Sequence, residues 1–185
     1  MFIKDGLPQG VLDLNKSFHP SVQHMKIISH RGNIKGPLPD QENRPSYIDS
    51  AMGSGYDVEI DLRIIDGELW LGHDEPQYKI EHSWLEPRRE FLWIHCKDLE
   101  AAKQCWGYQS FCHHGDPYTY TSTGKIWLHE THIGVPEMKI DDNIIIPMID
   151  DKDYPPFDGK PYAICTDYPS QIKRLKIRFL MKRVG

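Results

Sequence analysis

Short apolar runs rich in β-branched and aromatic residues recur along the chain, and turn-forming residues separate them. From Met25 onward the pattern predicts eight strands: Met25–Ser29, Tyr56–Ile64, Glu68–Leu71, Phe91–Cys96, Gln109–Cys112, Lys125–Leu128, Asn143–Met148 and Tyr162–Cys165. Residues 1–24 show no sustained period. We expect them to form an N-terminal arm, or to be translated upstream of a start at Met25.

Helical patterns lie between or after several of these strands. Arg44–Met52 has Asn43 as a candidate N-cap and Pro45 at its first position, where a missing N–H costs nothing. Asp98–Trp106 begins with an aspartate cap, and Tyr168–Lys182 places apolar residues at helical spacing. The sequence therefore predicts strands that alternate with helices.

This alternation predicts a parallel α/β sheet, and eight strands predict a compact (β/α)8, TIM-like barrel over residues 25–185. Such barrels typically take about 250 residues, which is more than this chain has. Some crossover helices must then be trimmed to turns, around Thr119–Gly124 and Asp150–Gly159. An open doubly wound sheet is the alternative architecture.

Composition narrows the class of protein. The chain has 185 residues, with 27 acidic and 22 basic side chains and a net charge of −5, which argues against nucleic acid as a partner. Four cysteines without CxxC spacing predict reduced thiols. No apolar stretch approaches a membrane span, and no secretory pattern opens the chain, so we expect a cytoplasmic location.

Three acids follow one another at alternate positions in the second predicted strand. Asp57, Glu59 and Asp61 project on one side of it, because strand side chains alternate between faces. In a barrel that side is the interior, where converging carboxylates require a neutralising cation. The alternative is an edge strand with a solvated acidic face, and Asp57, nearest the strand start, is the one most expected to be solvated.

Basic side chains stand at the ends of neighbouring predicted strands. His30 and Arg31 follow the first strand, His73 follows the third, and His95 and Lys97 end the fourth. Histidine can move a proton, and arginine offers a forked clamp for phosphate. Together with the carboxylates, this set suits a divalent cation that faces a phosphate group.

Weaker signals follow the later strands. His113, Asp116 and Trp127 are possible accessory residues of the site, although loop positions or ordinary core packing also explain them. The basic segment Lys173–Arg183 is expected to be a solvated helix face, with weak contact with an anionic membrane as the minor alternative.

With these residues in view, the sequence resembles the glycerophosphodiester phosphodiesterase family, a branch of the phospholipase-C-like phosphodiesterase barrels. The resemblance runs from His30 to Pro169. It rests on the order and spacing of these motifs: His30-Arg31-Gly32, Glu42-Asn43, Gly55 to Asp61, Asp66-Gly67, Gly72-His73-Asp74, Lys97 and Thr166-Asp167-Tyr168-Pro169.

The resemblance implies a metal-dependent hydrolase of a small phosphodiester, with Mg²⁺ or Ca²⁺ as the cofactor. His30 and His73 would be the acid–base pair, and Glu59 and Asp61 would hold the metal. Substrate contacts would come from three further residues: Arg31 and Lys97 at the phosphate, with Glu42 lining the site. The family also implies that a substrate hydroxyl attacks phosphorus first and that water then opens the cyclic phosphate.

One residue departs from the family pattern. Family members usually carry a glutamate, a third metal ligand, two residues before the strand-four lysine, and this chain has His95 there. Imidazole suits Zn²⁺ or Mn²⁺ better than Ca²⁺, so we expect those metals or weak Mg²⁺ binding. The chain also lacks an insertion large enough for the family's glycerol-binding cap, which weakens the expectation of glycerol specificity.

Two other functions remain open at the level of sequence. One is a phospholipase-D-like enzyme of lipid metabolism that acts on headgroups, which the short loops disfavour. The other is a phosphate-binding module that has lost catalysis, which the presence of both His30 and His73 disfavours. The expected partner is a small-molecule phosphodiester substrate, and the sequence specifies no oligomeric state.

Overall fold

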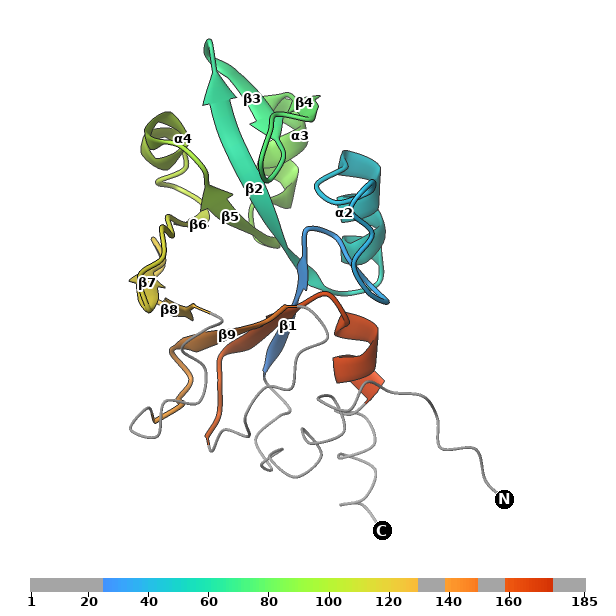
Figure 1. Cartoon of the computed structure of the whole chain (residues 1–185), viewed down its shortest axis with the longest axis vertical. Coiled ribbons are helices and arrows are strands. Elements are labelled where there is room, and N and C mark those ends of the chain that lie inside the picture. The colour runs from blue at the N-terminus through green and yellow to red at the C-terminus, as the bar shows by residue number, and fades with distance from the viewer. Residues whose placement is uncertain (1–24, 130–138, 150–158, 175–185) are drawn as a thin grey trace, which may run out of the picture.

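The computed structural model describes residues 25–129, 139–149 and 159–174, and its centre is one curled sheet (Figure 1). Seven of its described strands run parallel, in the hydrogen-bonded order β6-β5-β2-β1-β10-β9-β8. In chain order these are β1 (Lys26–His30), β2 (Asp57–Ile65), β5 (Leu92–Cys96), β6 (Gln109–Phe111), β8 (Ile126–Leu128), β9 (Ile144–Met148) and β10 (Ala163–Thr166). The carboxyl ends of all seven strands therefore meet on one side of the sheet.

Three antiparallel strands complete the sheet. β3 (Glu68–Leu71) and β4 (Tyr78–Ile80) extend from the long carboxyl half of β2, and β7 (Tyr118–Tyr120) pairs with β8. Asp66 and Gly67 form the turn between β2 and β3, with φ angles of 52° and 79°. Such left-handed pairs are typical of tight hairpins.

The predicted (β/α)8 barrel is wrong, although all eight predicted strands exist with ends within one residue of the prediction. The chain forms a curled, mixed half-barrel, because the third predicted strand folds back on β2 as a hairpin and adds no parallel strand. Only short helices accompany the sheet in the described residues: α2 (Pro45–Gly53), α3 (His82–Leu85), a 3₁₀ turn (Glu86–Arg88), α4 (Leu99–Gln104) and residues 169–174. No helix lies between β6 and β8, where residues 119–124 belong to the β7–β8 hairpin.

The helix ends confirm one cap and correct another. Asp98 caps α4 by accepting a hydrogen bond from the Ala101 N–H, as predicted. The N-cap of α2 is Arg44 and not Asn43, and its side chain makes no capping bond. The arm at residues 1–24, the connection at 150–158 and the predicted helix beyond residue 174 lie outside the described residues.

Apolar packing holds both faces of the curl. The outer face of β2 and β5 packs against α2 and α4 through residues such as Ile60, Ile94 and Ile48. Inside the curl, Trp93, Phe111, Trp127 and their neighbours form a second cluster. This inner cluster lies beneath the polar residues at the carboxyl ends of the strands. Within the described part of the chain, no helix is both long and apolar enough to cross a bilayer.

Candidate phosphoryl-transfer site

A cavity of about 800 Å³ opens at the carboxyl ends of the parallel strands. Nine of the predicted site residues line it: His30, Arg31, Glu42, Glu59, His73, His95, Lys97, His113 and Trp127. Asp61 is fully buried against the cavity wall, in contact with several of these side chains. Asp116 is exposed and does not line the cavity, so its accessory role is not supported.

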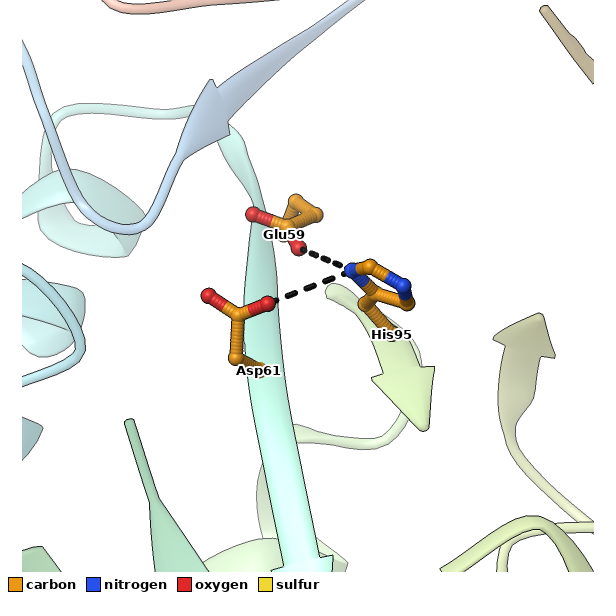
Figure 2. A group of neighbouring side chains, drawn as sticks. All are labelled: Glu59, Asp61 and His95. Atoms are coloured by element: carbon orange, nitrogen blue, oxygen red, sulfur yellow. Dashed lines mark ion pairs between the residues drawn. The ribbon is translucent and has the colours of Figure 1, made fainter. Parts of the chain in front are cut away.

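Glu59, Asp61 and His95 form a compact cluster in this cavity (Figure 2). Glu59 and Asp61 are two residues apart on β2 and share a face, and His95 on β5 is the register partner of Asp61. His95 Nδ1 lies 3.2 Å from Asp61 Oδ1 and 3.9 Å from Glu59 Oε1. One ligand atom from each residue lies within 4.8 Å of the other two. The cluster is therefore able to hold a metal ion.

The oxygen atoms of this cluster fit a cation. Glu59 Oε2 and Asp61 Oδ1 are buried and accept no hydrogen bond. A buried anionic oxygen that accepts no hydrogen bond is costly, and a divalent ion would reduce that cost. Two carboxylates and one imidazole are also ligand types that Zn²⁺ and Mn²⁺ accept. The third acid of β2, Asp57, lies at the strand start, half-buried, and pairs with Lys26 Nζ at 2.6 Å.

Asp61 is held rigidly on its other side. The Asn43 side chain donates to Asp61 Oδ2 and accepts from the Asp61 N–H, both at 2.9 Å. Arg31 Nε lies 2.9 Å from the same Oδ2. Asn43 thus positions the Asp61 carboxylate. Asn43 has a left-handed φ of 62°, and these two hydrogen bonds to Asp61 explain that backbone conformation better than a capping role does.

The two acids respond to burial in opposite ways. Burial and the charge of Asp61 raise the pKa of Glu59. Burial alone would also raise the pKa of Asp61, but His95, Arg31 and Asn43 outweigh it and hold that pKa well below its usual range. Asp61 is therefore the permanent anion of the pair, and Glu59 is the acid that gains most from a cation.

His30 is oriented by a carboxylate from the other end of the chain. Its Nδ1 lies 2.8 Å from Asp167 Oδ1, and its Nε2 lies 3.9 Å from Glu59 Oε2. Burial lowers the pKa of His30, but the bond to Asp167 and the charge of Glu59 outweigh burial and raise it above 6.5. His30 therefore holds its proton more readily than an ordinary histidine does.

His73 occupies a tightly folded loop that follows β3. Its Nδ1 lies 2.7 Å from Asp74 Oδ1, and burial and the Arg31 charge lower its pKa. The Arg63 guanidinium donates to the carbonyls of Gly72, His73 and Asp74, at 3.3, 2.5 and 3.0 Å. Gly72 has a φ of 150°, and a Cβ there would lie 2.0 Å from the Glu75 carbonyl oxygen, so only glycine fits.

The predicted phosphate-binding residues surround the same cluster. Arg31 Nη1 donates to Glu42 Oε2 at 3.0 Å, and Lys97 Nζ lies 3.6 Å from Asp61 Oδ1. Glu42 in turn accepts from Asn33 Nδ2 at 2.9 Å. The loop after β1 approaches α2 closely at Gly32, whose φ is 89° and where a Cβ would lie 2.9 Å from Tyr47. Both cations thus lie next to the acidic cluster and line the cavity.

The structure adds residues to which the sequence analysis assigned no role. Asp167 and Asn33 orient His30 and Glu42, and Asn33 Nδ2 also donates to Asp167 Oδ1 at 2.7 Å. Arg63 anchors the His73 loop. The sequence analysis placed Asp167 only in a family motif, and it gave Asn43 a motif position and a capping role instead of the contact with Asp61. Arg63 had no signal, because its partners are backbone carbonyls.

No protein-family model matches the chain, and no curated protein or solved structure is significantly similar to it.

Proposed function

We propose that this chain is a metal-dependent phosphodiester hydrolase of the glycerophosphodiester phosphodiesterase type. The proposal rests on one cavity that combines two features. The first is the candidate metal site of Glu59, Asp61 and His95. The second is a pair of histidines, His30 and His73, each oriented by a carboxylate. Hydrolysis of a phosphodiester needs charge stabilisation at the phosphoryl oxygens and two proton transfers. The described residues offer groups for each of these tasks.

The two histidines have complementary tendencies. The pKa of His73 is lowered by burial and by Arg31, which favours the neutral imidazole and makes His73 the base that takes a proton from the attacking water molecule. The pKa of His30 is raised, chiefly by Asp167 and Glu59, against the effect of burial. His30 is then the acid that gives its proton to the leaving alcohol. This division of labour follows the rule that paired catalytic groups have separated pKa values.

The remaining groups deal with negative charge. Arg31 and Lys97 line the cavity and would bind the non-bridging phosphate oxygens. A divalent ion held by Glu59, Asp61 and His95 would act as a Lewis acid toward the phosphoryl group. Because one ligand is an imidazole, we propose Zn²⁺ or Mn²⁺ ahead of Ca²⁺ and Mg²⁺.

The test is an assay of the metal-stripped full chain on bis(p-nitrophenyl) phosphate. The protein is reconstituted with Mg²⁺, Ca²⁺, Mn²⁺ or Zn²⁺ in turn, beside Glu59→Gln and the exposed control Glu68→Gln. We expect metal-dependent release of nitrophenol that Glu59→Gln abolishes and Glu68→Gln retains. No turnover with any metal would overturn the proposal and would favour a phosphate-binding module without catalysis.

A further inference from the structure

The cavity has two chemically different halves. Residues of β1, β2 and β5, together with residues that follow β1, β3, β5 and β10, contribute its charged side chains. The opposite half comes from the ends of β6, β8 and β9. Its described lining residues are Phe111, His113, Trp127, Leu128, His129, Pro147 and Ile149, and none of these is an aspartate, glutamate, lysine or arginine.

The second half, which we call the aromatic wall, is assembled by ring stacking. Phe111 stacks on His95 with centroids 5.0 Å apart and on Trp127 with centroids 4.2 Å apart. His113 and His129 form a further stacked pair, with centroids 4.6 Å apart. β6 and β8 lie at opposite ends of the parallel strand order, and the curl of the sheet brings the two strands close together (Figure 1). This approach lets the rings of Phe111 and Trp127 stack.

The aromatic wall lies directly next to the candidate metal site of Glu59, Asp61 and His95. Phe111 is the register partner of His95, so the wall and the proposed phosphoryl site share a boundary at that pair of residues. A phosphodiester whose phosphoryl group contacts Arg31 and Lys97 would extend one of its alcohol groups along the wall. The wall is therefore continuous with the proposed reaction centre.

We propose that the aromatic wall is the alcohol subsite and that it selects an apolar alcohol over glycerol; this inference rests on the proposed function. An apolar group gains from leaving water, whereas each glycerol hydroxyl that loses water here requires a hydrogen-bond partner. Among the described residues of the wall, the polar side-chain groups are the imidazoles of His113 and His129 and the indole N–H of Trp127. Burial and the neighbouring His129 and His95 lower the pKa of His113, which favours its neutral imidazole.

The test measures binding of three phosphonate monomethyl esters to the full chain by calorimetry with Mn²⁺ present. Their variable groups are benzyl, cyclohexylmethyl and 2,3-dihydroxypropyl; each ester has one negative charge, and its C–P bond resists hydrolysis. We expect the benzyl ester to bind at least tenfold more tightly than the dihydroxypropyl ester. Comparing the benzyl and cyclohexylmethyl esters shows whether the wall prefers a planar aromatic alcohol group or an alkyl, lipid-like one. Tight binding of either ester supports the inference.

Variants test the location of the subsite. Trp127→Leu should reduce the benzyl preference at least threefold, and Trp106→Leu, a change at a tryptophan that is 80% exposed and outside the cavity, should not. Because Trp127 also packs in the core, the half-buried His113→Ser serves as a second variant with the same expectation. A folded Trp127→Leu or His113→Ser protein that retains the full preference would overturn the proposed location.

The outcomes separate the two proposals. Equal or tighter binding of the dihydroxypropyl ester, or no binding of any ester, overturns the apolar subsite. If the benzyl preference is observed but bis(p-nitrophenyl) phosphate is not hydrolysed, the subsite stands as a binding site and the proposed catalytic function fails. If bis(p-nitrophenyl) phosphate is hydrolysed but the dihydroxypropyl ester binds most tightly, the proposed hydrolase activity is supported and the apolar subsite is overturned.

Discussion

His30 and Asp167 are 137 residues apart in the sequence, yet His30 Nδ1 and Asp167 Oδ1 lie 2.8 Å apart in the buried wall of the cavity. The pairing of β1 with β10 causes this approach, because their parallel register sets Ser29 beside Thr166 and so brings both strand ends to one level. A histidine whose Nδ1 faces a carboxylate presents Nε2 to the substrate in a fixed direction. The first and the last described strands thus each contribute one residue of this buried pair.

Asp167→Asn should weaken this unit without removing His30. The amide keeps an oxygen for the Nδ1 proton but removes the charge that helps to raise the pKa of His30. We expect kcat/KM on a phosphodiester to fall by roughly 10–100-fold, with loss of the acid form at lower pH than in the wild type. The measurement is the pH profile beside the exposed control Asp116→Asn, and identical profiles would contradict the role of Asp167.

Arg63→Met should affect the His73 loop. Arg63 lies outside the proposed chemistry, but its guanidinium donates to three successive backbone carbonyls around His73. Losing this anchor should lower kcat by about tenfold or more and leave KM nearly unchanged, because the base is displaced while the phosphate-binding cations remain. Steady-state kinetics beside Arg44→Met, an exposed control, checks this. A rise in KM with constant kcat would refute a positioning role.

His95→Glu should change which metal the cluster prefers. The substitution replaces imidazole by a third carboxylate next to Glu59 and Asp61, and such an oxygen set suits Mg²⁺ and Ca²⁺. We expect Zn²⁺ affinity to fall and the ratio of Ca²⁺ to Zn²⁺ affinity to rise about tenfold or more. Calorimetric titration of the metal-stripped protein measures this without reference to activity. Maximal activity with Ca²⁺ that His95→Glu leaves unaltered would contradict the proposed metal preference.

Activity should depend on pH in a bell-shaped manner. The pKa of His73 lies below its ordinary 6.5, so kcat/KM should rise as pH increases through that lowered value and frees the base. The pKa of His30 lies above 6.5, so activity should be lost as pH increases further and removes the acid's proton. The optimum is then expected between the pKa values of the two histidines. Proton NMR titration of the two imidazoles should show His30 titrating above His73, and the reverse order would exchange the proposed roles.

Local sequence patterns predicted the strands because each strand is a short apolar run bounded by turn residues. They failed on the topology at Glu68–Leu71, where the preceding Asp66-Gly67 pair makes a tight hairpin turn instead of a connection to a parallel strand. That dipeptide is a known hairpin signal, and weighing it would have removed one parallel strand from the predicted barrel. β4 and β7 were missed because they are short and bury at most one residue each, whereas the equally short β6 and β8 each bury two residues.

The charged site was more predictable than the fold. Glu59 and Asp61 share a face through strand alternation alone, and His95 and Lys97 follow the same rule on β5. Contacts made by single polar side chains over long sequence separations were not predictable. Asn43, which is bonded to Asp61 on both sides of its amide, and Asp167, which is paired with His30, owe their roles to register and chain path.

The central claim is that His30 and His73 act on a phosphodiester together with a metal ion at Glu59, Asp61 and His95. The most direct measurement is ³¹P NMR of the full chain with glycerophosphocholine and with methyl benzyl phosphate. Zn²⁺ or Mg²⁺ is added, and Mn²⁺ is left out because it is paramagnetic and broadens the signals. The account predicts that a phosphomonoester signal replaces the phosphodiester signal, that His30→Ala and His73→Ala each slow this by about 10²–10⁴-fold, and that the exposed control His82→Ala does not. A phosphodiester signal that persists for both substrates with either metal, or equal rates for all three variants, would contradict it.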